Sequence, residues 1–118
     1  MPPKEWAHED FCYVTTTGRH TGKPHQIEIW FAYQDGALYL LAGGGMSSDW
    51  VKNVIADPVV SIRVGGEGYE ARARVVANPD EDAVARRLLA AKYQNWREGL
   101  PLSSWAESAL VVAIEFGT

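Results

Sequence analysis

Residues 15–33 read TTTGRHTGKPHQIEIWFAY, a stretch in which a cationic loop passes directly into a strand. The first part places Gly18 and Gly22 among side chains that carry or can acquire positive charge. The second part alternates between two faces, one with Ile27, Ile29 and Phe31 and the other with Gln26, Glu28 and Trp30. Alternation with a period of two is typical of a half-buried strand. We therefore expect a strand over 25–33 that follows a polar loop.

Outward from this stretch, β-branched and aromatic runs and the turns between them predict the other strands. One run precedes the loop, and the Asp35-Gly36 pair is a hairpin signal. A cluster of glycines at 65–68 marks a second hairpin. The strands are expected at 11–17, 37–42, 59–64, 69–77 and 109–116.

Two helices are expected between these strands. Ser47 or Ser48 can cap a short helix, and Pro58 ends it because the residue before a proline avoids the helical region. A longer helix begins at Asn78, where a cap precedes a proline and an acidic first turn. Glu81 is placed three residues after that cap for a capping box.

The order of the elements predicts the fold class. Short antiparallel connections dominate, and no strand–helix–strand crossover pattern is present. We expect a mainly β protein with some α: an antiparallel six-stranded split β-barrel with two flanking helices. The long helix is expected to end near Gly99. Residues 1–118 contain no repeat or linker and are expected to form a single split-barrel domain.

Composition narrows the class of function. A formal net charge of −4 argues against sequence-independent nucleic-acid binding, which needs a basic face. No apolar run reaches the roughly 20 residues of a membrane helix, and the first residues do not resemble a signal peptide. The single cysteine, Cys12, suits a reducing compartment, so a cytoplasmic location is expected.

The loop between the first two strands is the first candidate site. A turn bounded by glycines exposes backbone N–H groups, and here Arg19, His20, Lys23 and His25 surround them. Such a concavity suits an anion. An ordinary polar hairpin loop has a similar composition, so the residues alone leave both interpretations open.

The segment Gly43-Gly44-Gly45 is the second candidate. Three glycines after a strand permit positive φ angles or the close approach of a ligand, and they equally suit a flexible connection. Glu28 and Trp30 share the strand face opposite the apolar residues. Trp30 would flank an aromatic ligand or contact a helix or a partner subunit.

Metal binding and cysteine catalysis are not favoured. His8 and Cys12 are four residues apart, which is not a recognised zinc spacing, and Cys12 lacks a Cys-x-x-Cys partner. A nucleophilic Cys12 with a histidine has the right residue types but no local motif. Cys12 is expected to be a small buried hydrophobe, and no metal is expected.

An ordered set of motifs resembles the deazaflavin-dependent nitroreductase and quinone reductase family. Its pattern, T-T-G-R-x-[ST]-G-x-P-R followed by a glycine turn and W-x-x-N-x-x-A-x-P, is matched by Thr16-Thr17-Gly18-Arg19, Thr21-Gly22, Pro24, Trp50, Asn53, Ala56 and Pro58. The resemblance covers about Val14 to Ala77. It implies a split-barrel, flavin-reductase-like fold and binding of the 8-hydroxy-5-deazaflavin coenzyme F420.

The resemblance also implies a set of coenzyme-binding positions. The phosphate and acidic tail would contact Arg19, His20, Thr21, Gly22, Lys23 and His25. The ring would be lined by Ile27, Glu28, Ile29 and Trp30. Backbone contacts would come from Ala42, Gly43, Gly44 and Gly45, and Trp50 would close one side.

The chain departs from the family pattern at several of these positions. His20 and His25 stand where the family has stronger cations, and Glu28 stands where a proline is expected. The lysine of the family's glycine turn is absent. Because these changes remove positive charge where an acidic tail would lie, FMN remains an alternative cofactor, and a non-catalytic flavin or fatty-acid binding protein remains an alternative function.

The activity implied by the resemblance is hydride transfer from reduced F420 to a small electron-poor acceptor, a quinone or a nitro compound. No compelling general acid is present; Tyr93, Ser103 and Ser104 are the candidates. Split barrels commonly pair through exposed strand faces, so a homodimer with Trp6 or Trp30 at its interface is a further expectation.

Overall fold

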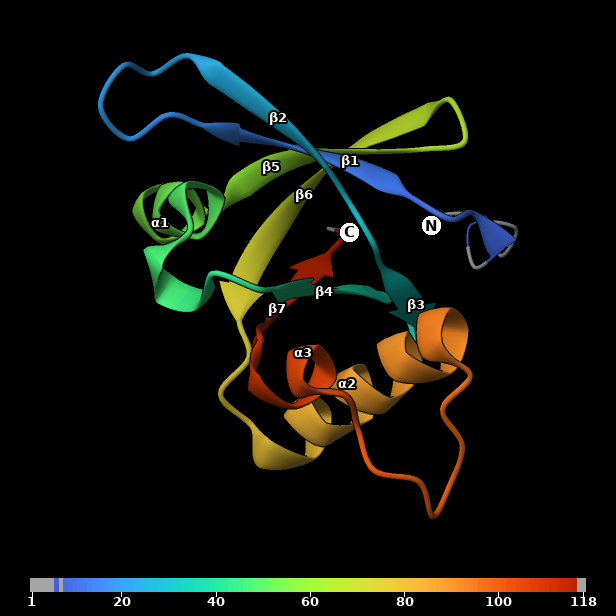
Figure 1. Ribbon diagram of the computed structural model, residues 1–118. Coiled ribbons are helices and arrows are strands. Elements are labelled where there is room, and N and C mark those ends of the chain that lie inside the picture. Colours follow the sequence, from blue (N-terminus) through green and yellow to red (C-terminus); the bar gives the residue numbers. More distant parts are fainter. Residues whose placement is uncertain (1–5, 7, 117–118) are drawn as a thin grey trace.

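A computed structural model, which describes Trp6 and residues 8–116, contains one antiparallel sheet of split-barrel type with helices on its outside (Figure 1). In this described part the sheet has seven strands in the order β2-β1-β5-β6-β7-β4-β3. The strands are β1 Cys12–Thr17, β2 Pro24–Ile29, β3 Ala32–Gln34, β4 Ala37–Ala42, β5 Val59–Val64, β6 Glu67–Val75 and β7 Leu110–Glu115. The expected fold class is confirmed.

The strand count differs from the six expected because the stretch 25–33 forms two strands. β2 ends at Ile29 and β3 begins at Ala32, and the two lie at opposite edges of the sheet. Two residues span only a few ångströms, on the order of 3.5 Å each. The sheet must therefore curl until its edges meet at Trp30-Phe31, and this corner closes the split barrel.

The corner is held by side chains of a helix instead of by strand pairing. Phe31 is fully buried, and its N–H donates to the hydroxyl oxygen of Tyr93 at 3.0 Å. The Phe31 carbonyl oxygen lies 3.0 Å from the ammonium of Lys92 and 2.9 Å from the Tyr93 hydroxyl. Buried backbone groups must find partners, and here two neighbouring side chains supply them.

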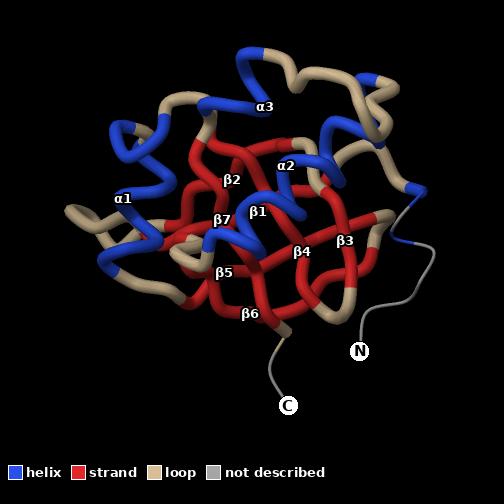
Figure 2. Tube along the Cα trace, turned by 90° about the horizontal axis from the view of Figure 1, so that it is seen from below, coloured by secondary structure: helices blue, strands red, loops and turns tan. Residues whose placement is uncertain are grey.

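Helices cover two sides of the sheet (Figure 2). The α-helices of the described chain are α1 Asp49–Ala56, α2 Pro79–Gln94 and α3 Ser104–Ser108, and a 3₁₀ turn, η2 Gly45–Ser47, precedes α1. The short α3 was not expected. The expected end of the long helix near Gly99 is wrong: Asn95 adopts a left-handed conformation with φ 55° and ends α2 there.

The start of α2 is capped by Asn78 as expected, but without the expected capping box. The Asn78 side chain accepts from the N–H groups of Asp80 and Glu81. Glu81 does not complete a capping box, because its carboxylate binds the Arg74 guanidinium through two contacts of 2.8 Å and accepts from the Tyr39 hydroxyl. Hydrogen bonding to Arg74 lowers the pKa of Glu81 to about 2. This network ties α2 to the sheet.

Two cores lie on opposite faces of the sheet. The inner core fills the curled sheet and includes Leu38 and Leu40 of β4, and the second core packs Tyr39 and Leu41 against α2 and α3. Trp6 is 3% exposed and packs edge-on against the rings of Tyr33, Tyr69 and Phe116. Trp6 therefore packs inside the chain and does not present the exposed surface that the expected dimer interface would use. Among the described residues, no helix combines the length and apolar character needed to cross a bilayer.

Replacing Tyr93 by phenylalanine tests the corner. The variant keeps the ring but removes the partner of a buried N–H, so we expect the free energy of unfolding to fall by about 1–3 kcal/mol. Urea denaturation followed by tryptophan fluorescence measures it. Tyr13→Phe, a change at an exposed tyrosine of β1, is the control. An equal and small loss in both variants would contradict the role assigned to the Tyr93 hydroxyl.

Candidate functional site

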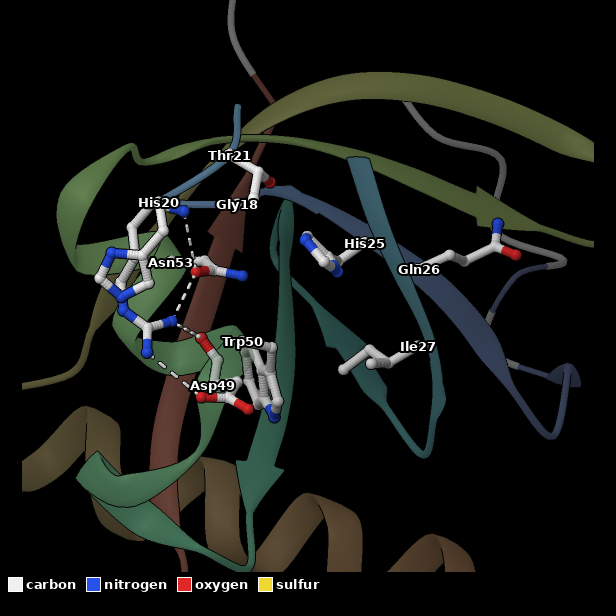
Figure 3. Close-up of a pocket in the computed structure, with 10 residues that line it drawn as sticks. Gly18, His20, Thr21, His25, Gln26, Ile27, Asp49, Trp50 and Asn53 are labelled. Atoms are coloured by element: carbon white, nitrogen blue, oxygen red, sulfur yellow. Dashed lines mark hydrogen bonds and ion pairs between the residues drawn. The ribbon is translucent and has the colours of Figure 1, made fainter. Parts of the chain in front are cut away.

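A groove of about 470 Å³ lies between the loop that joins β1 to β2 and the first turns of α1 (Figure 3). Trp50 and Ile27 face each other across it. Both side chains are half-buried at the edge of the inner core, so the groove has apolar walls. Its lining residues are Gly18, Arg19, His20, Thr21, His25, Gln26, Ile27, Asp49, Trp50 and Asn53. We call it the loop–helix groove.

The loop is held in a tight backbone conformation. The Gly18 N–H donates to the Lys23 carbonyl oxygen and the Gly22 N–H donates to that of Gly18, each at 2.8 Å. Gly22 has φ 72°, a value that favours glycine. The His25 imidazole packs so closely on Gly18 that an added Cβ would lie 2.7 Å from its Nε2 atom. The glycines therefore bring the His25 ring and the loop backbone together.

Asn53 of α1 fixes the loop to the helix. Its side-chain oxygen accepts from the Arg19 backbone N–H at 3.2 Å and from the Arg19 guanidinium at 2.8 Å. Its amide nitrogen donates to the Thr16 hydroxyl of β1 at 3.1 Å. Asn53 is only 4% exposed and Thr16 is buried too. One buried carboxamide thus positions the strand end, the loop and Arg19.

The electrostatics of the groove are mixed. Arg19 forms an ion pair with Asp49 at 3.2 Å, and the Asp49 carboxylate is itself highly exposed. His20 and His25 line the same groove, and Lys23 lies in the same loop. The cations and hydroxyls at this end suit an anionic group, while the carboxylate of Asp49 opposes a high density of negative charge there.

A second pocket, of about 420 Å³, lies farther along β2. Its walls are the aromatic rings of Phe11, Trp30 and Trp105 together with Ile29 and Leu41, and its polar lining comes from Glu28 and Gln94. β2 lines both hollows: residues 25–27 face the loop–helix groove and residues 28–29 face this one, with Trp30 directly after the strand. We call it the aromatic pocket.

The predicted coenzyme-binding residues divide between these two hollows. The loop–helix groove contains Arg19, His20, Thr21, His25, Ile27 and Trp50. The aromatic pocket contains Glu28, Ile29 and Trp30. The lining of the two hollows does not include Gly22, Lys23, Ala42, Gly43, Gly44 or Gly45. Ala42 is buried, and an added Cβ on Gly43 would lie 3.9 Å from the Trp105 ring, which places this turn beside the aromatic pocket.

The three candidate catalytic residues have other contacts. Burial raises the pKa of the Tyr93 hydroxyl to about 12, and that hydroxyl bonds the backbone of Phe31 and the Asp10 carbonyl oxygen. The Ser103 hydroxyl caps α3 and donates to the Gln94 side chain at 2.8 Å. The Ser104 carbonyl oxygen accepts from the Ser108 hydroxyl. Each side chain remains a prediction as a proton donor.

Several residues of the site were missed from the sequence. The sequence identifies Asn53 only as a motif position, and Asp49 is not among the predicted site residues. Trp105 reaches the aromatic pocket from α3, a helix that no sequence signal indicated. Cys12 is fully buried, and burial raises the pKa of its thiol to about 12. Within the part of the chain that the structure describes, no three metal-ligating side chains gather.

Comparison with known proteins gives the chain a family and a fold. Residues 3–113 match the model of a family described as F420H(2)-dependent quinone reductase. A solved F420-H2 dependent reductase, FDR-A, is 22% identical with a TM-score of 0.68 over 90% of this chain and 94% of its own. A structure described as a domain-swapped dimer is also 22% identical, with a TM-score of 0.68 over 90% of this chain and 80% of its own.

The same fold also occurs in a flavoprotein. A FAD-binding protein from Mesorhizobium loti is 18% identical, with a TM-score of 0.66 over 98% of this chain and 86% of its own. Identities of this size show the fold alone. No curated protein matches the chain.

Replacing Asn53 by alanine tests the anchor of the loop. The change leaves the Thr16 hydroxyl and the Arg19 N–H without their partner, so we expect a loss of about 1–3 kcal/mol in the free energy of unfolding. Hydrogen exchange of the amides at 18–23 should accelerate more than exchange in β5. Gln34→Ala, which removes an exposed carboxamide from β3, is the matched control. Unchanged exchange in the loop would contradict the anchoring role.

Proposed function

The chain belongs to the F420H2-dependent quinone reductase family, which is a family of enzymes, and on that premise we propose that it binds F420 in the loop–helix groove and reduces a small electron-poor acceptor. This site assignment rests on one observation: the cationic loop and the Trp50 side chain line the same groove. A phosphate end and a flat ring require these two kinds of surface.

The residues present fit the phosphate end of such a coenzyme. Arg19, His20 and His25 supply positive charge or N–H donors, and Thr21 adds a hydroxyl at the same end of the groove. Arginine and imidazolium groups are effective phosphate partners. Asp49 reduces the net positive charge, so the groove is better suited to a single phosphate than to a dense cluster of carboxylates.

The remaining lining fits a flat ring. Trp50 and Ile27 form opposite apolar walls, and both are supported by the inner core. Support from a packed core lets such walls orient a ligand with little loss of side-chain freedom. The ring would then extend along β2, away from the cationic loop.

The bound coenzyme would supply the hydride, and the protein would supply binding and orientation. A quinone that accepts one hydride from reduced F420 and one proton becomes a hydroquinone, so the electrons and atoms balance without a further reductant. The Tyr93 hydroxyl stays protonated at physiological pH because its pKa is raised, and it bonds the barrel corner. We therefore infer that solvent, and not Tyr93, supplies the proton.

FMN is the second candidate cofactor. The Asp49 carboxylate favours it, because FMN carries a phosphate without an acidic tail. An FMN-dependent reductase would use the same loop and the same Trp50 wall. A carrier that binds a flavin or a fatty acid without turnover would also use the groove.

A turnover assay tests the proposed activity. Reduced F420 is mixed with menadione in the presence and absence of the purified protein, and its oxidation is followed by the return of F420 absorbance. We expect the protein to accelerate the reaction in proportion to its concentration. Binding of F420 without acceleration would instead support the non-catalytic carrier.

Two substitutions test the coenzyme site, one that removes a positive charge and one that removes a negative charge. Arg19→Ala removes a cation from the groove, and we expect F420 to bind about 1–3 kcal/mol more weakly. Asp49→Asn removes the opposing carboxylate, and we expect binding to tighten by roughly threefold to tenfold. Equilibrium titration of tryptophan fluorescence measures both.

Arg97→Ala, at an exposed arginine after α2, is the control for a general loss of positive charge. Weaker binding in both Arg19→Ala and Asp49→Asn would show that the ion pair acts only by holding the loop. It would remove Arg19 from the coenzyme contacts.

A further inference from the structure

The aromatic pocket has walls that meet nearly at a right angle. The indole of Trp30 stacks on the Tyr93 ring with centroids 4.4 Å apart and an interplanar angle of 2°. Trp105 stands against Trp30 at 88°, with centroids 5.4 Å apart. A flat aromatic ligand can stack on one such wall while its edge meets the other, and these are the two geometries that aromatic pairs prefer.

These walls are fixed before any ligand arrives. Tyr93, whose ring stacks on Trp30, is itself anchored by its hydrogen bonds to the barrel corner. Trp105 belongs to α3, whose start is capped by Ser103. Yet Trp30 is 38% exposed and Phe11 is 45% exposed. Large aromatic surface that is both rigid and open to solvent is typical of a binding site.

The aromatic pocket lacks the cations of the loop–helix groove. Among the described residues that line it, Glu28 is the only one with an ionisable side chain. The ion pairs found between described residues do not include Glu28. Lys92 on the adjacent helix directs its ammonium to the Phe31 carbonyl oxygen at 3.0 Å. A ligand in the pocket therefore meets a carboxylate that these ion pairs leave free.

We propose that the aromatic pocket is the acceptor site, that it takes a flat uncharged aromatic acceptor against Trp30 and Trp105, and that Glu28 excludes anionic acceptors. This inference rests on the proposed function, since only a reductase needs a second ligand. β2 then separates two ligands by charge, with the anionic end of the coenzyme at its first residues and a neutral acceptor at its last.

Two ligands of nearly equal shape distinguish stacking on the aromatic walls from exclusion of anions by Glu28. The compound 4-nitrobenzamide is neutral, and 4-nitrobenzoate differs from it by one negative charge. Each is titrated into the protein without coenzyme, and binding is followed by quenching of tryptophan fluorescence. We expect the amide to bind about tenfold more tightly than the benzoate, the effect of a unit charge at several ångströms in a partly solvated site.

Glu28→Gln should bring the two affinities within about threefold of each other by strengthening only the benzoate. Glu67→Gln, at the exposed start of β6, is the matched loss of charge and should leave the tenfold difference unchanged. Trp105→Leu should weaken both ligands, whereas Trp96→Leu should weaken neither. A difference that persists in Glu28→Gln, or that Glu67→Gln removes equally, would overturn the inference.

The binding experiment and the turnover assay fail independently. Acceptor binding that follows Glu28 without coenzyme-dependent turnover would contradict the proposed function while supporting the pocket. The opposite outcome is turnover of menadione together with binding of the two nitro compounds that changes in neither Glu28→Gln nor Trp105→Leu. It would support the proposed function and overturn the acceptor site.

Discussion

The structure depends on one constraint: a single stretch of chain supplies both edges of the sheet. β2 and β3 are separated only by Trp30 and Phe31, so the sheet must curl to bring its edges together. The backbone of Phe31 is buried at that corner and is bonded by Tyr93 and Lys92 of α2. The helix that covers the second core therefore also closes the barrel, and this closure places β2 between the two hollows.

The site follows from this arrangement. One end of β2 carries the cationic loop, which the buried Asn53 fastens to α1, and the other end carries Trp30, which Tyr93 supports from behind. The same tyrosine thus fixes the corner and a wall of the aromatic pocket. Family membership makes the chain an F420H2-dependent reductase, and the cations near one end of β2 and the Glu28 carboxylate near the other are the physical basis for the proposed placement of coenzyme and acceptor.

Local patterns in the sequence were sufficient to predict most strands and to identify the family. The alternation after His25, the Asp35-Gly36 turn and the cap at Asn78 each depend on neighbouring residues, and each lies where expected. The break at Trp30-Phe31 could not be predicted, because its cause is Tyr93, a residue 62 positions away in the sequence. Glu81 likewise binds Tyr39, 42 positions away in the sequence, and Arg74 of the neighbouring strand instead of completing a capping box. The roles of Asn53 and Trp105 likewise depend on contacts between distant elements.

The central claim is that the loop–helix groove is built for F420, and a paired titration tests it most directly. The purified protein is titrated with oxidised F420 and separately with FMN, following the ligand and tryptophan fluorescence, since Trp50 forms one wall of the groove. The account predicts saturable binding that is tighter for F420, and it predicts that Trp50→Leu abolishes the fluorescence change. Binding of FMN alone, or of neither ligand, would contradict it.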